Sequence, residues 1–334
     1  MSGKLKFWAD DFKNETNDKT MFSLVGIGFK QVDNWSRLFS IVFSLVLTIF
    51  SINSIWTFYG TSETVISGWL NAFFPLEIWF WVFGGLFVFL LGYALAKRDK
   101  MLRNLVAMLI AFNVGTTLSE FWKATIDFPS VEFPFETIGD AGNSLYFRLF
   151  FLVPVIPMFL VYWLLIRKNG QFPLRAGDLS VKTKLFFPRG KKQNSWKTIL
   201  VRYWIFVVLP VFLLMQITVG FEPILSGKLF IFLVPILILA LFNAFAEELL
   251  IQGFILPNVV SSLRPAFGVF LMGMFFGLLH FGASPDVIAG LPQALIIGFF
   301  AWMGAKAVVE TGGIGFSILA HMGADVAIFS SSFI

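Results

Sequence analysis

Residues 243–281 read NAFAEELLIQGFILPNVVSSLRPAFGVFLMGMFFGLLHF, and this stretch decides how the rest of the chain is interpreted. It contains two adjacent carboxylates, Glu247 and Glu248, inside an apolar run that starts near Leu229. It closes with His280, one of the two histidines in the protein. A charged side chain at the centre of a bilayer costs about 3 kcal/mol, so such residues are normally retained for function. The stretch therefore predicts a functional site among apolar helices.

The composition predicts a membrane protein with many spans. Hydrophobic residues make up 57% of the chain and charged residues 13%, with a mean hydropathy of +0.80. Soluble proteins carry about 25% charged residues, so this chain lacks the polar surface to face water on all sides. The absence of cysteine excludes disulfides, thiolate metal sites and a cysteine nucleophile. The formal charge of +5 is too small to indicate a nucleic-acid partner.

Nine apolar runs are long enough to cross a bilayer, which takes about 20 helical residues. They cover residues 38–58, 77–96, 102–119, 145–166, 199–219, 229–256, 266–283, 287–309 and 312–330. The sequence therefore predicts an all-α, polytopic transmembrane helix bundle of about nine spans, or eight to ten given the uncertain ends of the runs.

Charges in the connecting segments predict the orientation in the membrane. A basic cluster, residues 97–100, separates the second run from the third, and the most basic loop, residues 167–198, separates the fourth from the fifth. Between the third and fourth runs lie the acids Glu120, Asp127, Glu132, Glu136 and Asp140. Lys and Arg mark cytoplasmic loops. We therefore predict an integral membrane protein with a cytoplasmic N-terminus, the acidic loop outside and the C-terminus outside. The expected membrane is a prokaryotic cytoplasmic membrane.

The same features divide the chain into four parts. Residues 1–37 form a cytoplasmic or interfacial segment, without a signal for cleavage near Met1. Residues 38–166 form a four-span region, and residues 167–198 a basic cytoplasmic loop that is expected to meet anionic lipid. Residues 199–334 form a five-span bundle that holds the active site.

Helical spacing brings the polar residues of this bundle onto shared faces. Residues three or four apart lie on one face of a helix, so Asn243 aligns with Glu247, and His321 with Asp325. At a rise of about 1.5 Å per residue, the carboxylate of Glu247 and the imidazoles of His280 and His321 can lie at similar depth in three neighbouring helices.

Two chemistries fit this set of side chains. One of the adjacent acids, Glu247 or Glu248, is a candidate general base. Alternatively, the set Glu247, His280 and His321 could hold a divalent metal such as zinc, with an open position for water. Either arrangement would activate water against a peptide carbonyl, while His321 and the side chain one turn later, Asp325, could stabilise the resulting oxyanion.

Other intramembrane hydrolases fit the sequence less well. The chain contains no HExxH motif, which disfavours a zincin-type site. It contains no GxSxG motif, and Ser317, within GFSIL, lacks the flanking pattern of a nucleophile. Asp325 is the one Asp well inside a late span, which disfavours a two-Asp aspartyl site.

Three motifs together resemble the CAAX-protease and bacteriocin-processing (CPBP) family, which includes Abi-type bacterial proteins. They are EELLIQG at 247–253, FFGLLH at 275–280 and HMGAD at 321–325. The family pattern is two Glu with an Arg four residues later, a Phe with a His four later, and a His with Asn or Asp four later. The resemblance covers about residues 199–330, and its matched positions are Glu247, Glu248, Phe276, His280, His321 and Asp325.

The resemblance implies an intramembrane endopeptidase of the glutamic or metalloprotease type, acting on a membrane-associated protein or peptide. It implies that Glu247 and His280 activate the attacking water, and that His321 with Asp325 stabilises the oxyanion. A prenylated CAAX terminus is the substrate of one branch of the family. The family has also been argued to use a metal, so a divalent metal stays open. One position departs from the pattern, because Gln252 stands where the family usually has Arg.

Two other interpretations stay open. Gln252 can hydrogen-bond but cannot pair with a carboxylate as Arg would, which favours a non-catalytic membrane scaffold or immunity-like protein with a membrane protein partner. A proton-coupled transporter would use Glu247, Glu248 and the histidines as a relay. In every interpretation Asn243, Gln252 and Phe276 are supporting residues.

Small and paired residues complete the expectations for the last spans. Gly277, Gly298 and Gly304 are expected to permit close approach of helices. Lys306 and Glu310 are four residues apart and are expected to pair near a cytoplasmic helix end.

Overall fold

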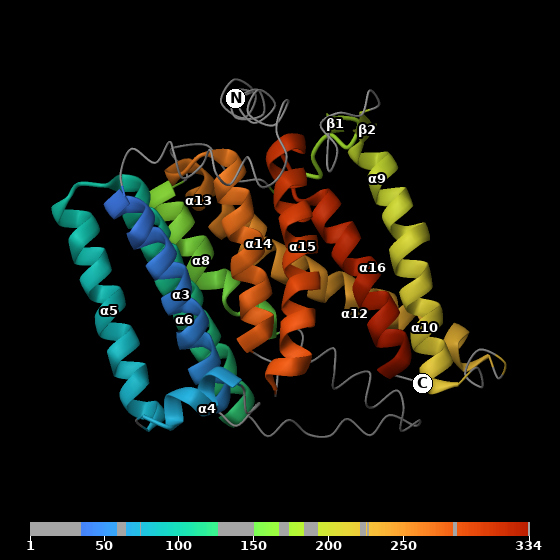
Figure 1. Cartoon of the computed structure of the whole chain (residues 1–334), viewed down its shortest axis with the longest axis horizontal. Helices are drawn as coiled ribbons and strands as arrows, with labels where there is room; N and C mark the ends of the chain where they lie inside the picture. Colours follow the sequence, from blue (N-terminus) through green and yellow to red (C-terminus); the bar gives the residue numbers. More distant parts are fainter. Residues whose placement is uncertain are drawn as a thin grey trace.

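The computed structural model of this chain describes most of the predicted spans. It covers residues 35–58, 65–73, 75–125, 150–166, 174–183, 193–220, 225, 227–282 and 286–332. The interfacial segment predicted for residues 1–37 lies outside the described residues as far as position 34. Most of the predicted acidic loop also lies outside them. Within the described residues the chain is a bundle of helices with one two-stranded hairpin (Figure 1). The prediction of an all-α, multi-pass membrane bundle is confirmed.

The four predicted runs of the N-terminal region are helical. They form α3 (Trp35–Phe58), α5 (Leu76–Ala96), α6 (Lys100–Thr125), and α8 (Val155–Val161) continued by the π-helix η2 (Tyr162–Ile166). A short helix, α4 (Val65–Asn71), and a single 3₁₀ turn, η1 (Phe150–Leu152), lie between them. These two elements were not predicted, because both are much shorter than an apolar run of membrane-spanning length.

The five predicted runs of the C-terminal region are helical as well. They form α9 (Trp196–Tyr203), η4 (Trp204–Val208) and α10 (Leu209–Val219); α12 (Lys228–Glu248), η5 (Leu249–Ile255) and α13 (Leu256–Ser262); α14 (Pro265–Gly282); α15 (Val287–Thr311); and α16 (Gly315–Ser332). In the basic loop, strands β1 (Lys182–Thr183) and β2 (Asn194–Ser195) form an antiparallel hairpin that was not predicted.

Length and hydropathy separate these helices into groups. Five segments are long and apolar enough to cross a membrane: Trp35–Ile55, Lys100–Thr125, Trp196–Thr218, Phe230–Ser262 and Val287–Thr311. Shorter apolar helices are Trp81–Ala96, Val155–Ile166 and Pro265–Phe281. Helix α16 belongs to neither group, and His321 and Asp325 lie in its central turns.

The third predicted run ends later than the sequence indicated. Helix α6 continues to Thr125, so Glu120, which was predicted to lie in the acidic loop, is on the helix and 3% exposed. Lys123, three residues later, pairs with Glu120 at 2.7 Å. Because a charge of opposite sign one turn away stabilises a helix, the run of helical residues passes through these polar positions.

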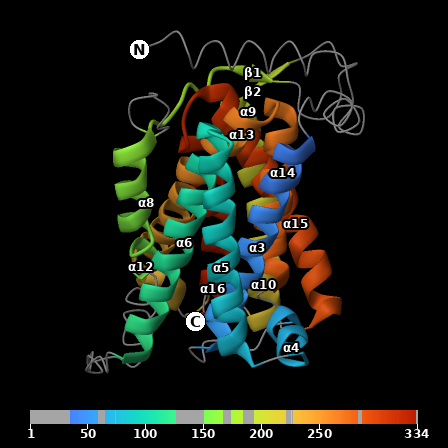
Figure 2. The same cartoon turned by 90° about the vertical axis from the view of Figure 1, so that its left-hand side faces the viewer.

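The helices run up and down between two ends of the bundle. The end of α5, the β-hairpin and the turn between α15 and α16 lie at the upper end in both views, whereas α16 ends at the lower end (Figures 1 and 2). The described basic residues Lys97 and Arg98 therefore lie at the same end as the hairpin, which agrees with the prediction that the basic segments share one side. The orientation in the membrane stays a prediction.

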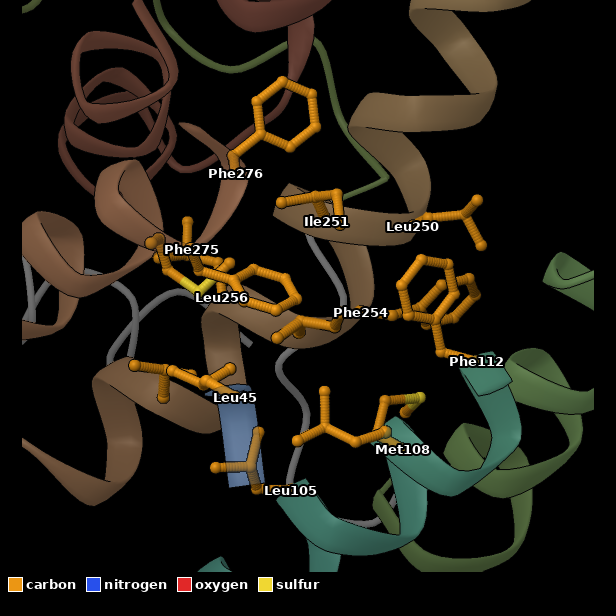
Figure 3. Close-up of a cluster of buried hydrophobic side chains, with 14 of the residues drawn as sticks. Leu45, Leu105, Met108, Phe112, Leu250, Ile251, Phe254, Leu256, Phe275 and Phe276 are labelled. Carbon is orange, nitrogen blue, oxygen red and sulfur yellow. The ribbon is translucent and has the colours of Figure 1, made fainter. Parts of the chain in front are cut away.

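One hydrophobic core joins the N-terminal helices to the C-terminal bundle (Figure 3). Leu45 of α3 and Leu105 of α6 belong to the same cluster as Phe254 of η5 and Phe275 of α14. Lipid tails are as apolar as these side chains, so such a core is stabilised mainly by close packing rather than by transfer from water. The N-terminal region thereby supports η5, the segment that directly follows Glu248.

Close packing of α14 against α15 depends on glycine. A Cβ added to Gly273 would lie 2.8 Å from the carbonyl oxygen of Gly298, and a Cβ on Gly298 would lie 3.0 Å from that of Gly273. Gly277 also faces the backbone of Gly298. The prediction that glycines permit close helix approach is confirmed for this pair of helices.

A short segment of the basic loop, residues 175–178, crosses the turn between α15 and α16, and we call it the strap. The backbone N–H groups of Ile314 and Gly315 donate to the carbonyls of Arg175 at 2.9 Å and Ala176 at 3.2 Å. The first N–H groups of a helix have no partner within that helix. The strap supplies these partners and thereby fixes where α16 begins.

The end of α15 is tied to α9 by a buried group of polar side chains. Lys306 pairs with Glu310 as the spacing predicted, and both residues are buried, at 4% and 5% exposure. Trp196 donates from Nε1 to Glu310 Oε2 at 2.7 Å, and its ring contacts Phe316 of α16 edge-on at 4.7 Å. The upper ends of α9, α15 and α16 are therefore held together.

Candidate active site

Three helices position the side chains that the motifs singled out. Glu247 and Glu248 end α12, where the chain enters the π-helix η5, and His280 lies in the last turn of α14. His321 and Asp325 lie on α16, which packs along α12. Single π-helical segments inside α-helices are found frequently at functional sites, because they rotate the residues that follow out of the regular register.

Glu248 and His321 are in direct contact. Glu248 Oε1 lies 2.9 Å from His321 Nδ1, and Ser317 donates from its hydroxyl to Glu248 Oε2. A carboxylate oxygen accepts, so Nδ1 of His321 carries the hydrogen. Glu248 is 5% exposed, and a buried carboxylate requires partners of this kind. One carboxylate of α12 is thus held by two donors one turn apart on α16.

The other ring nitrogen of His321 faces two further carboxylates. His321 Nε2 lies 3.8 Å from Glu247 Oε2 and 3.7 Å from Asp325 Oδ1. These distances exceed the range of a direct hydrogen bond, about 2.7–3.2 Å. The side chains of Glu247 and His321 are each 17% exposed, against 7% for Glu248 and 8% for Asp325. The side chains of Glu247 and His321 are therefore the more accessible of these four.

Asn243 and Asp325 form the second contact between α12 and α16. Asn243 donates from Nδ2 to Asp325 Oδ2 at 2.9 Å, and both residues are buried. The amide holds one oxygen of Asp325, and the other oxygen, Oδ1, is the one directed at His321. Asn243 is therefore placed to orient Asp325.

The backbone fixes the tautomer of His280. His280 Nδ1 lies 3.0 Å from the carbonyl oxygen of Phe276, and a carbonyl can only accept. Nδ1 therefore carries the hydrogen in the neutral ring, and Nε2 is its basic nitrogen. The ring of Phe276 lies 4.7 Å from that of His280 and 6.3 Å from that of His321, measured between centroids. Phe276 thus contacts both imidazoles.

Gln252 does not join this group. It is 1% exposed, and its Nε2 donates to the carbonyl of Ala301 on α15 at 3.4 Å. Among the described residues its Oε1 has no hydrogen-bond partner, and neither of its polar atoms bonds Glu248.

The predicted ligands of a divalent metal are Glu247, His280 and His321. In the described part of the chain, no group of three or more His, Cys, Asp or Glu residues is arranged to hold a metal ion. The Nδ1 atoms of His280 and His321 are, however, held by a carbonyl and a carboxylate, a pattern typical of metal-binding histidines. A divalent metal at Glu247, His280 and His321 stays a prediction.

The contact of Ser317 was not predicted from the sequence, where this residue lacks the flanking pattern of a nucleophile. In the structure its hydroxyl donates to Glu248. The signal was present in the spacing, because positions 317, 321 and 325 are four apart and share one face of α16.

Residues 228–327 match the family model described as type II CAAX prenyl endopeptidase Rce1-like. This segment belongs to the CAAX-protease family. The predicted resemblance is confirmed, although the match begins at the first residue of α12 rather than near position 199. No curated protein and no solved structure matches the chain.

The CAAX-protease segment extends from α12 into α16 and contains every site residue named above. The family points to a protease in general, and thus to hydrolytic chemistry. Helices α3 to α10 and the strap lie outside the match, and residues of α3 and α6 belong to the core that supports η5.

Proposed function

We propose that this chain is an intramembrane endopeptidase that hydrolyses a peptide bond of a membrane-associated protein or peptide. The observation that supports this best is the grouping of three carboxylates around His321, between α12 and α16, inside the segment that matches the CAAX-protease family. Ionisable groups at such depth are retained for function rather than for packing.

Water activation is assigned to Glu247 and His280. Glu247 is the more accessible of the adjacent acids, and its Oε2 lies 3.8 Å from His321 Nε2. We assign the attacking water to a position beside these two atoms. Glu247 accepts a proton from this water, and the water oxygen bonds the carbonyl carbon of the substrate. His280, whose basic nitrogen is Nε2, is assigned to the same water by its match to the family motif. The proton then moves to the leaving amine as the carbon–nitrogen bond breaks.

Stabilisation of the oxyanion is assigned to His321 and Asp325. Glu248 holds Nδ1 of His321, so the ring is oriented before substrate binds. A protonated ring also carries a hydrogen on Nε2, which can be donated to the oxyanion. Asp325, oriented by Asn243, faces this nitrogen and stabilises the imidazolium.

A metal is the alternative source of activated water. The residues that would hold it are Glu247, His280 and His321, and the contacts of both histidine Nδ1 atoms support this choice. A bound divalent ion would supply a Lewis acid and a hydroxide nucleophile. In that case Glu248 and the carbonyl of Phe276 orient the two imidazoles.

The proposed substrate is attached to the membrane, because the site lies among apolar helices. A prenylated C-terminal peptide is one candidate, and another lipid-anchored or membrane-spanning chain is a second. The proposed location is a prokaryotic cytoplasmic membrane with the N-terminus inside.

Cleavage of membrane-associated peptides by the purified protein in detergent tests this function. We expect Glu247→Ala and His280→Ala to abolish cleavage while the protein stays folded. Asp286→Asn is the matched control, since Asp286 is an exposed N-cap of α15 whose capping bond Asn retains. Wild-type cleavage by Glu247→Ala or by His280→Ala would contradict the proposal.

Metal content measured on the same samples by mass spectrometry separates the two mechanisms. Stoichiometric metal that is lost together with cleavage in His280→Ala indicates a metalloprotease. Cleavage without metal indicates that Glu247 and His280 act directly on water.

Two other outcomes would assign a different function. A protein that co-purifies with this chain, stays bound to the Glu247→Ala variant and is never cleaved indicates the scaffold function that Gln252 favours. Proton-dependent flux in vesicles that is lost with Glu247→Gln indicates a transporter.

A further inference from the structure

Ser317 and His321 hold one carboxylate together. The hydroxyl of Ser317 donates to Glu248 Oε2, and His321 Nδ1 donates to Glu248 Oε1 at 2.9 Å. Ser317 is 3% exposed, so water does not compete for its hydroxyl. Within the described part of the chain, the one ion pair of Glu248 is with His321, and no Lys or Arg contacts it.

The backbone of α15 confines the hydroxyl of Ser317. A Cβ added to Gly304 would lie 2.5 Å from Ser317 Oγ but 3.5 Å from Ser317 Cβ. The hydroxyl therefore occupies the space that a side chain at position 304 would fill. Gly304 makes this space available and leaves the hydroxyl directed at Glu248.

We propose that Ser317 is a positioning residue for peptide hydrolysis, which acts by fixing Glu248 so that Glu248 holds His321 with Nε2 directed at the reacting groups. The inference rests on the proposed function and deepens it. Ser317 contacts neither substrate nor water in this account, because its hydroxyl is committed to the carboxylate of Glu248.

Two donors restrict a carboxylate more than one does. With His321 as the single donor, Glu248 can rotate about its terminal bond, and the imidazole can turn with it. A misplacement of about 1 Å can cost about 100-fold in rate. A hydrogen bond to a charged group corresponds to about 10- to 100-fold. We therefore expect loss of the Ser317 hydroxyl to lower kcat by about 10- to 100-fold.

The first test compares three serine variants in cleavage assays. Ser317→Ala should lower kcat by about 10- to 100-fold. KM should change less than about twofold, because the contacts with substrate are unchanged. Ser317→Thr should restore kcat, since it keeps the hydroxyl. Ser330→Ala is the matched control: Ser330 lies on the same helix, is 1% exposed and bonds Gln216. A wild-type kcat in Ser317→Ala, or an equal loss in Ser330→Ala, would overturn the inference.

A double-mutant cycle of Gly304→Ala with Ser317→Ala tests the role of the Ser317 hydroxyl without the Ser317→Thr variant. In the wild-type background the new methyl group displaces the Ser317 hydroxyl and should lower kcat as Ser317→Ala does. In the Ser317→Ala background the methyl group meets Ser317 Cβ at an ordinary distance and should change kcat less than about twofold. Additive losses from the two substitutions would contradict the inference.

A third readout does not depend on cleavage. The protein has two histidines, so ¹⁵N-histidine NMR gives two imidazole environments, and His280→Ala assigns them. Ser317→Ala should shift the Nδ1 signal of His321 and leave that of His280. An unchanged His321 signal overturns the inference even where the wild type cleaves. A wild type that does not cleave overturns the proposed function, and the inference with it.

Discussion

Asn243 Nδ2 lies 2.9 Å from Asp325 Oδ2, and this hydrogen bond joins α12 to α16 across 82 positions of sequence. Both residues are buried, at 3% and 5% exposure. The contact of Glu248 with His321 joins the same two helices. The register of the two helices that carry most of the site is therefore set in part by the site's own polar residues.

Replacement of Asn243 tests whether this register matters for catalysis. We expect Asn243→Ala to lower kcat about tenfold, because Asp325 loses a hydrogen bond that orients it toward His321. Asn243→Asp should lower kcat further, since it places a second buried carboxylate opposite that of Asp325. Cleavage kinetics measure both effects. Asn113→Ala is the control, because Asn113 bonds a carbonyl of its own helix, and a loss of kcat in that variant equal to the loss in Asn243→Ala would contradict the assignment.

The adjacent acids are expected to differ in role. Glu247→Gln should lower kcat by at least about 1000-fold with little change in thermal stability, because it removes the base and is isosteric. Glu248→Gln should lower kcat by about 10- to 100-fold and also destabilise the fold, since Ser317 and His321 contact different oxygens of Glu248 and an amide keeps only one acceptor oxygen. Kinetics and thermal unfolding in detergent distinguish the two. The reverse order of effects would show that Glu248 is the base.

Motif spacing predicted which residues share a helix face, aligning Asn243 with Glu247 and His321 with Asp325. The structure adds the contacts between helices, in which Asn243 bonds Asp325 and Glu248 contacts His321. The spacing could not show which of the adjacent acids touches His321, because that depends on how η5 and α16 pack against α12. A π-helix has no simple sequence signal, and the bond of Gln252 to the carbonyl of Ala301 could not be predicted from spacing either.

Contacts between segments distant in sequence could not be predicted from spacing either. Lys306 and Glu310 were predicted to pair from their spacing, but the indole of Trp196 lies 114 positions away from Glu310 in sequence. The strap was not foreseen either, because it is built from backbone hydrogen bonds that leave little trace in residue types. Such contacts depend on how loops close over helix ends, which periodicity does not describe.

Removal of the buried carboxylate near the upper end of α15 should destabilise the protein. Glu310→Leu leaves the ammonium of Lys306 without this partner and should cost about 3–5 kcal/mol. The double variant Lys306→Met, Glu310→Gln should recover most of the loss, because Gln still accepts from Trp196 and no charge is buried. Unfolding by heat or by detergent titration measures both. A double variant that is no more stable than Glu310→Leu would show that the ion pair does not carry the effect.

Gly313 is expected to be essential for the strap. A Cβ at this position would collide with the carbonyl group of Arg175 and with the backbone nitrogen of Gly177, so Gly313→Ala must push the strap away from α16. The N–H groups of Ile314 and Gly315 then lose their acceptors, at about 1–3 kcal/mol for each if they stay buried.

The start of α16 should shift with the loss of these bonds, and Ser317 lies within the first turn of that helix. We therefore expect Gly313→Ala to lower both the melting temperature and kcat. Gly84→Ala is the control: nothing lies within 4 Å of a Cβ there, and Ala is favoured over Gly inside a helix by about 0.5–1 kcal/mol. Equal melting temperatures and equal kcat values for the two variants would mean that the strap does not position α16.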